Sequence, residues 1–173
     1  MSSRNISIKS TEIEDLPFLK DLWNDGRVMQ AVGFPDGVGE TDATVLQWFE
    51  RRNAQLGFRH FVVVDDQVRR YGEVCFNLVD GMAGLDIKLA AESQGKGIAT
   101  IALNEVINRA FRHSSSCELV WTEPRVENAR ARKLYTRCGL REGPRPKDMK
   151  RQGKPFWSLH RKEWSATYES AKR

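Results

Sequence analysis

The spacing of apolar residues predicts that strands and helices follow one another along most of the chain. Helical spacing, with apolar side chains every three or four positions, is found at residues 11–25, 41–56, 98–112 and 127–138. Extended segments rich in β-branched and aromatic side chains are expected at residues 6–8, 61–64, 68–78, 85–89, 118–122, 140–145 and 156–160. This order predicts a mixed α+β unit in which a run of consecutive strands precedes the third helix.

Residues that cap or break regular structure support these boundaries. Thr41 is expected to cap the second helix, and Gly139 is expected to end the fourth. Asp80-Gly81 and Gly84 mark a turn between two strands. No internal repeat and no linker rich in Gly, Pro or Ser divides the sequence, so we expect residues 1–173 to form a single domain.

The segment Gln94-Gly95-Lys96-Gly97-Ile98-Ala99 joins the strand that ends at Leu89 to the third helix. Its two glycines allow the backbone to turn without Cβ clashes, so that consecutive N–H groups can point to one place at the positive end of a helix. This favours an anionic ligand such as a pyrophosphate, although an ordinary turn between strand and helix could have the same sequence. The third glycine of a dinucleotide-binding fingerprint and the Gly-Lys-Ser/Thr ending of a P-loop are both absent, so neither nucleotide fold fits.

Composition limits which cellular compartment and which partners are expected. The 173 residues include 28 Lys and Arg against 23 Asp and Glu, and the net charge of +5 favours anionic ligands without indicating nucleic acid. Cys75, Cys117 and Cys138 form an odd set without Cys-x-x-Cys spacing, which fits reduced thiols in the cytoplasm. The first residues lack the apolar core of a signal peptide, and no apolar run is long enough to span a bilayer, so we expect a cytoplasmic protein without a membrane partner.

Three motifs resemble the GNAT superfamily of N-acetyltransferases. They are Gln94-x-x-Gly97-x-Ala99, Trp121-Thr122-Glu123 at the end of a strand, and Asn128-Ala129-x-Ala131-x-x-Leu134-Tyr135-x-x-x-Gly139-Leu140. The resemblance is specific over residues 84–140 and looser over the whole chain, and it departs from the common pattern at Gln94, Ala99 and Leu140. It implies a central, mostly antiparallel, twisted sheet of about six or seven strands flanked by about four helices, with splayed strands at an acetyl-CoA site. The branch that it resembles most contains ribosomal-protein N-terminal acetyltransferases and small-amine acetyltransferases.

The resemblance also implies which residues hold the co-substrate, acetyl-CoA. Backbone N–H groups from Gly95 to Ala99 would bind its pyrophosphate at the start of the helix, and the free main chain of residues 87–89 would pair with its pantetheine arm. Lys96 adds a charge of the right sign, although a solvated lysine would have the same sequence context. Asn128 would reach the pantetheine, cap the last helix, or do both. The implied cofactor-binding residues are Ile87, Lys88, Leu89, Gln94, Gly95, Lys96, Gly97, Ile98, Ala99 and Asn128.

Two catalytic residues follow from the same resemblance. An alkyl ammonium must lose a proton before it attacks a thioester, and Glu123, at the end of a strand, is the predicted base. Asp86 and Glu73 are rival bases, and Glu123 could instead end its strand in an ion pair with an arginine. Tyr135 is the predicted acid that protonates the leaving thiolate, although its helical spacing also fits a core aromatic.

The predicted reaction moves an acetyl group directly to a primary amine, either a small amine or a protein N-terminus, in a ternary complex that needs no metal. A CoA-binding regulatory domain without turnover is the alternative. Nucleic-acid binding through the basic residues between Arg141 and Lys154 is disfavoured, because no aromatic recognition motif accompanies them. We expect the acceptor between the first two helices and the last hairpin, and a monomer or a homodimer.

Overall fold

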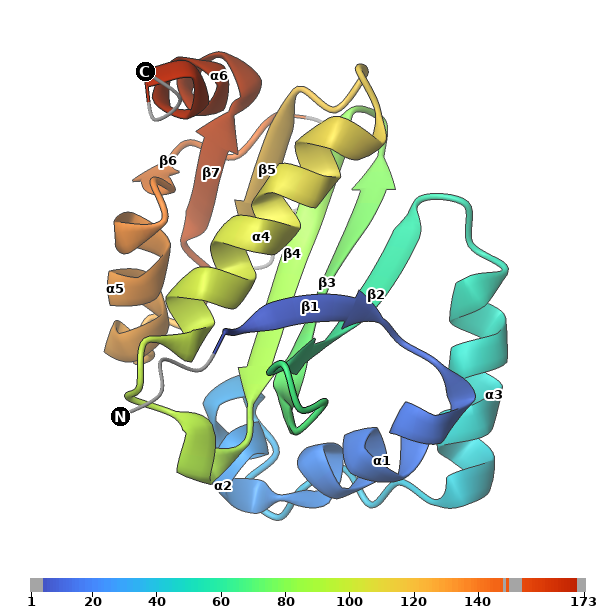
Figure 1. Ribbon diagram of the computed structural model, residues 1–173. Helices are drawn as coiled ribbons and strands as arrows, with labels where there is room; N and C mark the ends of the chain where they lie inside the picture. Colours follow the sequence, from blue (N-terminus) through green and yellow to red (C-terminus); the bar gives the residue numbers. More distant parts are fainter. Residues whose placement is uncertain (1–4, 148, 150–153, 171–173) are drawn as a thin grey trace.

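The computed structural model describes residues 5–147, 149 and 154–170, with the backbone alone described for residues 168–170. Within these residues the chain forms a seven-stranded sheet with the order β1-β2-β3-β4-β5-β7-β6 (Figure 1). Neighbouring strands are antiparallel, except that β4 and β5 are parallel. The strands are β1 (Ser7–Ser10), β2 (Phe58–Val64), β3 (Arg70–Val79), β4 (Met82–Leu89), β5 (Leu119–Thr122), β6 (Arg141–Gly143) and β7 (Phe156–His160).

Helices lie on both faces of this sheet. The α-helices of the described residues are α1 (Leu16–Asn24), α2 (Gly26–Met29), α3 (Asp42–Asn53), α4 (Ile98–His113), α5 (Ala129–Arg137) and α6 (Arg161–Ser170). Short 3₁₀-helices occur at η1 (Ile13–Asp15), η2 (Gln30–Val32) and η3 (Ala91–Ser93). In Figure 1, α4 crosses the sheet in front, whereas α1 and α2 lie at the lower edge and α3 at the right.

Each face of the sheet has its own apolar core, because side chains alternate along the strands. On one face, Phe61 and Phe76 pack with the buried stripe of α4, which runs from Ile98 to Phe111. On the other face, Val62 and Val64 pack with buried residues of α1, α2 and α3. The sheet is therefore a middle layer between two groups of helices.

The predicted strands and helices are confirmed in type and order. The Thr41 side chain caps α3 by accepting the N–H of Thr44, and Gly139 follows α5 with a φ of +88°. Gly84 was expected in a turn, and this prediction is wrong because Gly84 lies within β4. A Cβ at Gly84 would lie 3.1 Å from the ring of Trp121, so the glycine leaves room for an indole rather than breaking the strand.

Two helices are additional to the four that the sequence predicted. The helix α2 has only four residues, which is too short for an apolar period to be recognised, and it is capped by the Asp25 side chain, which accepts the N–H of Arg27. The helix α6 follows β7 directly and packs Trp164 against Phe111, with ring centroids 4.9 Å apart.

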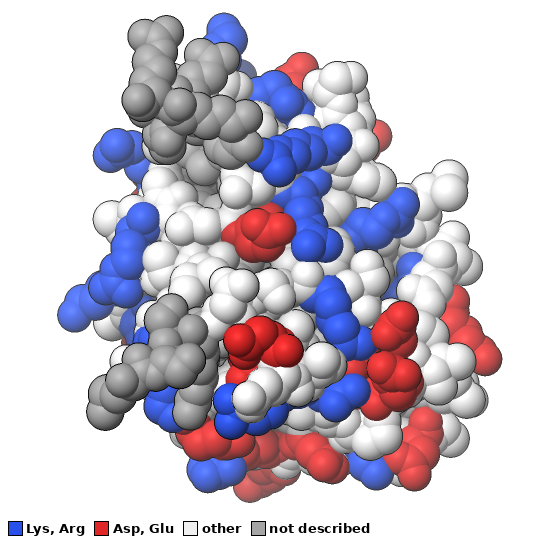
Figure 2. All heavy atoms as spheres, viewed as in Figure 1, with Lys and Arg blue, Asp and Glu red and all other residues white. Residues whose placement is uncertain are grey.

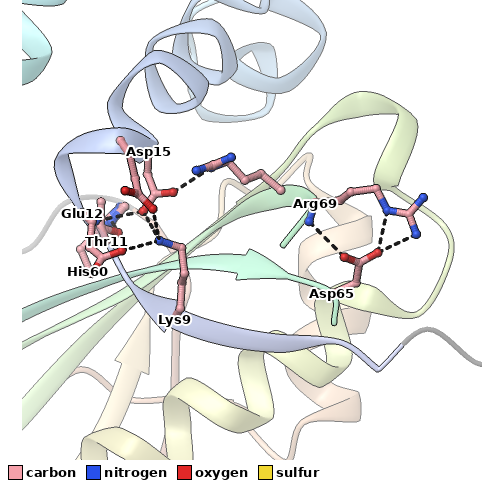
Figure 3. Close-up of polar contacts among 9 residues, drawn as sticks. Lys9, Thr11, Glu12, Asp15, His60, Asp65 and Arg69 are labelled. Carbon is pink, nitrogen blue, oxygen red and sulfur yellow. Dashed lines mark hydrogen bonds and ion pairs between the residues drawn. The ribbon is translucent and has the colours of Figure 1, made fainter. Parts of the chain in front are cut away.

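A buried carboxylate, Asp15, joins β1, η1 and β3. Its side chain is fully enclosed and accepts hydrogen bonds from Lys9 Nζ at 2.7 Å, Arg70 Nε at 2.7 Å and the Glu12 N–H at 2.9 Å. Figure 3 shows the Lys9 ammonium directed at Asp15. Burial alone would raise the pKa of Asp15, but the bonds from Lys9, Glu12 and Arg70 outweigh it and lower that pKa. The N-terminal strand is therefore held to the sheet by charge as well as by backbone pairing.

A second buried carboxylate, Glu73, joins β2, β3, β4 and α1. Its Oε1 accepts a hydrogen bond from Trp23 Nε1 at 2.9 Å and lies 3.1 Å from Lys88 Nζ, and its Oε2 lies 2.8 Å from His60 Nε2. The other ring nitrogen of His60 is 2.7 Å from the Thr11 hydroxyl (Figure 3). Burial would raise the pKa of Glu73, but the charge of Lys88 and the hydrogen bonds from His60 and Trp23 lower it to about 2.

Replacing Glu73 with Gln is expected to destabilise the fold at pH 7 by about 3 kcal/mol, because the buried Lys88 ammonium loses one of its partners. The pKa of Glu73 in the folded chain, about 2, lies below its ordinary value of 4.5. Its ionisation therefore stabilises the fold above pH 4.5, and this contribution disappears as the pH falls toward 2. The difference in unfolding free energy between wild type and variant should shrink across that window, as measured by urea unfolding at several pH values.

The control for this experiment is Glu50→Gln, which removes a carboxylate on the exposed side of α3. This variant should match wild type at every pH. A difference between wild type and Glu73→Gln that stays constant from neutral to acid pH would contradict the assigned charge state of Glu73.

Candidate active site

The strands β4 and β5 pair over only part of their length. The parallel register joins residues 82–84 to residues 119–121, whereas β4 continues to Leu89 and stays paired with β3 throughout. Residues 85–89 therefore have no partner on β5. The Ile87 N–H donates to the Asp86 side chain and the Leu89 carbonyl accepts from the Gln94 side chain, and the remaining backbone groups on that side are left for another partner. The splayed strands implied for an acetyl-CoA site are confirmed.

A loop with open backbone N–H groups follows β4 at the same end of the sheet. Gly95 and Gly97 both have a φ of +78°, and Gly97 is the N-cap of α4 without any side-chain cap. Within the described part of the chain, no acceptor is bonded to the N–H groups of residues 95–99. A Cβ at Gly97 would meet nothing within 4 Å, so the space around this turn is free. The helix start therefore presents unpaired donors and its positive end to the same open space.

A cleft of about 490 Å³ lies where the two strands part. One wall is formed by β4 from Asp86 to Leu89, and another by the end of β5 and the loop after it, from Thr122 to Arg125. The glycine loop, the first turn of α4 and the inner face of α5 contribute further residues. Val28, Ala31 and Val32, from α2 and η2, add an apolar wall.

The structure brings most of the predicted site residues into this one cleft. The lining includes Ile87, Lys88, Leu89, Gln94, Gly95, Gly97, Ala99, Glu123, Asn128 and Tyr135. Lys96 and Ile98 are outside it, since Lys96 is exposed and the side chain of Ile98 is buried in the core. The Asn128 side chain caps α5 by accepting the N–H of Ala131 at 3.0 Å, as one of its two predicted roles required.

Tyr135 is buried at the inner face of α5. Its exposed fraction is 6%, and its ring packs against Trp157 with centroids 6.5 Å apart. Burial raises the pKa of the Tyr135 hydroxyl, and a hydrogen bond with Thr122 opposes that rise only in part. The hydroxyl therefore keeps its proton at neutral pH and lies between the end of β5 and α5, facing the cleft.

Glu123 forms an ion pair with Arg145. The exposed fractions of the two side chains are 7% and 12%, so solvent screens this pair only weakly. Arg145 also donates to the carbonyl of Lys154 and stacks its guanidinium 5.5 Å from the ring centroid of Phe156. The segment after β6 is therefore fixed to the end of β5 by the carboxylate that was predicted as the base.

The rival carboxylates differ in their access to the cleft. Asp86 lines it with a half-exposed side chain, accepts the N–H of Ile87 at 2.9 Å and pairs with the Lys88 ammonium. Glu73 lies behind Lys88 and is not among the lining residues. Burial would lower the pKa of Lys88, but Asp86 and Glu73 raise it, so Lys88 stays charged.

Basic side chains that are not among the predicted site residues also line the cleft. Arg125 lines it next to Gly33, at which a Cβ would lie 2.9 Å from an Arg125 terminal nitrogen. Arg130 bonds to the Gln94 side chain beside Gly95, and Lys133 and Arg137 lie on the same side of α5. In the sequence, Arg130, Lys133 and Arg137 recur on one side of the helix, which is compatible with an approach to CoA but more typical of a solvated basic face. The approach of Arg125 to Gly33 had no sequence signal, because it depends on how two distant loops meet.

Other expectations fall outside the cleft or outside the described residues. In the segments expected to surround the acceptor, the aromatic side chains of Trp23, Trp48 and Trp157 do not line the cleft and belong to the packed interior. Lys150 and Arg151, part of the basic segment considered for nucleic acid, lie outside the described residues. On the face seen in Figure 2, most acidic side chains lie in the lower half, whereas basic ones are spread over both halves.

Metal ligands, reactive thiols and membrane-spanning helices are considered next, for residues 5–147, 149 and 154–170. No group of three His, Cys, Asp or Glu side chains in this part of the chain is placed to hold a metal. Cys75, Cys117 and Cys138 are free thiols, and burial raises the pKa of Cys138 to about 11, so it is a poor nucleophile at neutral pH. None of the helices described is long and apolar enough to cross a membrane.

Comparisons with known proteins agree with the fold. The family described as "Acetyltransferase (GNAT) domain" matches residues 6–141. A spermidine N(1)-acetyltransferase of Vibrio cholerae is 27% identical over 140 residues, which is 79% of this chain and 79% of that protein.

Two solved structures share the fold. Spermidine N-acetyltransferase from Vibrio cholerae, in complex with CoA and spermine, superposes with a TM-score of 0.78 at 22% identity, covering 93% of this chain and 98% of that one. An aminoglycoside acetyltransferase in complex with coenzyme A also gives 0.78, at 18% identity, covering 95% of this chain and 99% of that one. The predicted acetyl-CoA-dependent N-acetyltransferase is therefore confirmed, together with its mixed α+β fold. The matched region spans most of the chain, and the chain belongs to the GNAT acetyltransferase family.

Proposed function

We propose that this chain transfers the acetyl group of acetyl-CoA to a primary amine by direct attack in a ternary complex, in the cleft between β4 and β5. The observation that carries the proposal is the meeting in one cleft of an unpaired strand edge, an open N–H loop at a helix start and a buried tyrosine. A regulatory CoA-binding domain would need the first two features but would have no use for the third.

The residues around the cleft fit the donor. The N–H groups of residues 95–99 would bind pyrophosphate oxygens at the positive end of α4, and Arg130, next to Gly95, adds a cation there. The edge of β4 beyond its pairing with β5 would pair with the amide groups of the pantetheine arm, as an added strand pairs with a sheet edge. The Ile87 N–H would then exchange its bond with the Asp86 side chain for one with the arm. The side-chain oxygen of Asn128 caps α5, so its side-chain amide nitrogen is left to contact the arm. Bound in this way, acetyl-CoA supplies an activated thioester.

Tyr135 is the proposed acid. The raised pKa of its hydroxyl keeps a proton available throughout the neutral range, and Thr122 orients the oxygen. A buried donor at this position would deliver its proton to the leaving sulfur while the surrounding apolar side chains limit access of water. The ring packing against Trp157 holds the side chain in place without involving the hydroxyl.

Glu123 is the proposed base, and Arg145 is a positioning residue for it. The ion pair with the guanidinium holds the Glu123 carboxylate at the cleft wall. The carboxylate would take the proton from the acceptor ammonium through a water molecule. Glu73 is unsuitable, because its pKa of about 2 and its burial behind Lys88 leave it neither basic nor accessible. Asp86 lines the cleft and is the competing base.

The acceptor class proposed here is a primary amine, either a small molecule or a protein N-terminus. The relatives named above act on spermidine or on aminoglycosides, so amine chemistry is common to them while the rest of the acceptor is not. The free thiols of the three cysteines support action in a reducing compartment such as the cytoplasm. The protein would act as a monomer or a homodimer.

A direct assay tests the function. The protein is incubated with acetyl-CoA and a panel of amines and N-terminal peptides, and free thiol release and the mass of the acceptor are followed. Acetylation of at least one amine, with equimolar CoA release, supports the proposal. Tight CoA binding without acetylation of any acceptor would instead support the regulatory domain.

Replacing Tyr135 with Phe should lower kcat by about 100-fold, because a general acid contributes about 10²–10⁴-fold to rate. The affinity for CoA and the melting temperature should stay close to wild type, because the ring and its packing remain. Since the pKa of Tyr135 is raised above its ordinary value near 10, wild-type kcat should not fall from loss of this proton until above pH 10. Steady-state thiol release across pH, with isothermal titration of CoA, measures these effects. Unchanged turnover in Tyr135→Phe would remove the assignment.

Replacing Glu123 with Gln should lower kcat/KM by about 100-fold at neutral pH, because the amine then loses its proton without help. The matched variant Asp86→Asn removes the competing carboxylate and should cost much less. The pH–rate profiles of both variants are compared with that of wild type, with a melting curve for each to detect unfolding. The reverse ranking of the two variants would identify Asp86 as the base.

A further inference from the structure

The carboxylates of the cleft are already neutralised by cations of the protein. Among the described lining residues the acidic side chains are Asp86 and Glu123. Asp86 pairs with Lys88, and Glu123 pairs with Arg145. Glu73 is buried behind Lys88 and bonded on both oxygens. An acceptor with several positive charges would therefore find no lining carboxylate without a cationic partner to replace the water around those charges.

By contrast, the cleft is lined by more basic than acidic side chains. Arg130, Lys133 and Arg137 on α5 also line the cleft, and Arg130 lies at the glycine loop, where a phosphate donor would bind. Arg125 is separate from this group, because it lies in the loop after β5 and reaches toward Gly33 at the end of η2. The cleft beside the apolar wall of Val28, Ala31 and Val32 therefore has a cation that the donor site does not require.

The geometry around Arg125 leaves its guanidinium available. Its ion pair with Glu127 joins Nε to an oxygen 3.7 Å away, and both side chains are about half or more exposed, at 47% and 80%. Such a pair is weak. Within the described residues, this pair through Nε is the polar contact of the guanidinium, and its terminal nitrogens have no side-chain partner. Gly33, with a φ of +107° and no Cβ, permits the guanidinium to lie against the main chain of the opposite loop. The side chain is thus held near the cleft by shape while its planar donors stay open.

From these observations we infer that the acceptor is a primary amine that also carries a carboxylate, and that Arg125 binds that carboxylate and determines specificity. This inference rests on the proposed function and names its substrate class. A guanidinium presents two parallel N–H donors that match a carboxylate, which gives direction as well as charge. The acceptor's apolar stem would lie on the wall formed by Val28, Ala31 and Val32. The polyamine acceptor of the relatives carries the opposite charge, so this chain differs from them in what it acetylates.

Matched acceptors test the inference. The kcat/KM for short ω-amino acids is compared with that for their primary amides, which have the same shape without the charge, and with spermidine, all at one salt concentration. Wild type should prefer the carboxylate over the amide by at least about tenfold, which corresponds to about 1.4 kcal/mol of differential binding. A free amino acid and a short peptide with an acidic second residue form two further arms, and their ratio tells whether the acceptor is a metabolite or a protein N-terminus.

Variants of Arg125 assign the preference to this residue. In Arg125→Gln the ratio of carboxylate to amide should fall to near one through a higher KM for the carboxylate, and Arg125→Lys should restore part of it, because a lysine keeps the charge but not the planar pair of donors. Arg51→Gln, on the exposed outer side of α3, is the control and should keep the wild-type ratio. The affinity for CoA, measured by isothermal titration, should be the same in all of these proteins.

Several outcomes would overturn the inference while leaving the proposed function intact. They are a preference of wild type for spermidine, an unchanged ratio in Arg125→Gln, or a weaker affinity of that variant for CoA, which would place Arg125 in the donor site. Failure to acetylate any amine would overturn the proposed function instead. In that case, the affinities of the CoA-loaded protein for the ω-amino acids and for their amides are compared. Tighter binding of the ω-amino acids would support the inference, and equal affinities would overturn it too.

Discussion

The incomplete pairing of β4 and β5 is the constraint on which the site depends. The two strands are joined through residues 82–84 and then part, while β3 holds β4 on one side and β7 holds β5 on the other. Pro124, which has no N–H, follows soon after the end of β5. The sheet is thus continuous enough to be rigid but open at one place, and α4 and α5 begin beside that opening. The glycine loop between β4 and α4, Tyr135 and Glu123 converge because each lies at the edge of the same gap.

A strand that lacks a neighbour on one side needs support from elsewhere. For β4 this comes from a chain of polar contacts that runs from Thr11 through His60 and Glu73 to Lys88 and ends at Asp86 in the cleft. Groups of this kind are costly to bury unless each one is paired, and here each has at least one partner. These hydrogen bonds and ion pairs therefore connect the N-terminal segment to the wall of the cleft. They lie on the face of the sheet that α1 and α3 cover.

The sequence was sufficient to predict the parts of this protein that depend on interactions between residues close together in the chain. Apolar periodicity, the Thr41 cap and the glycine loop each act over a few residues, so they predicted the long helices, the strands and the donor loop. The pairing of Glu123 with Arg145 joins residues 22 positions apart through the register of β5, β6 and β7, and only the general possibility of an arginine partner was visible. The position of Arg125 depends in the same way on the meeting of two loops, of which one contains the short, unpredicted helix α2.

The surplus of cations around the cleft has a consequence for kinetics. A polyanionic donor is drawn toward such a surface over about 10 Å at about 0.1 M salt, and additional dissolved ions shorten that range. The rate of donor capture should thus depend on ionic strength under conditions in which the buried pairs that hold the fold are scarcely affected. Values of KM for this enzyme therefore have meaning only together with the buffer in which they were obtained, and they describe the medium as well as the cleft.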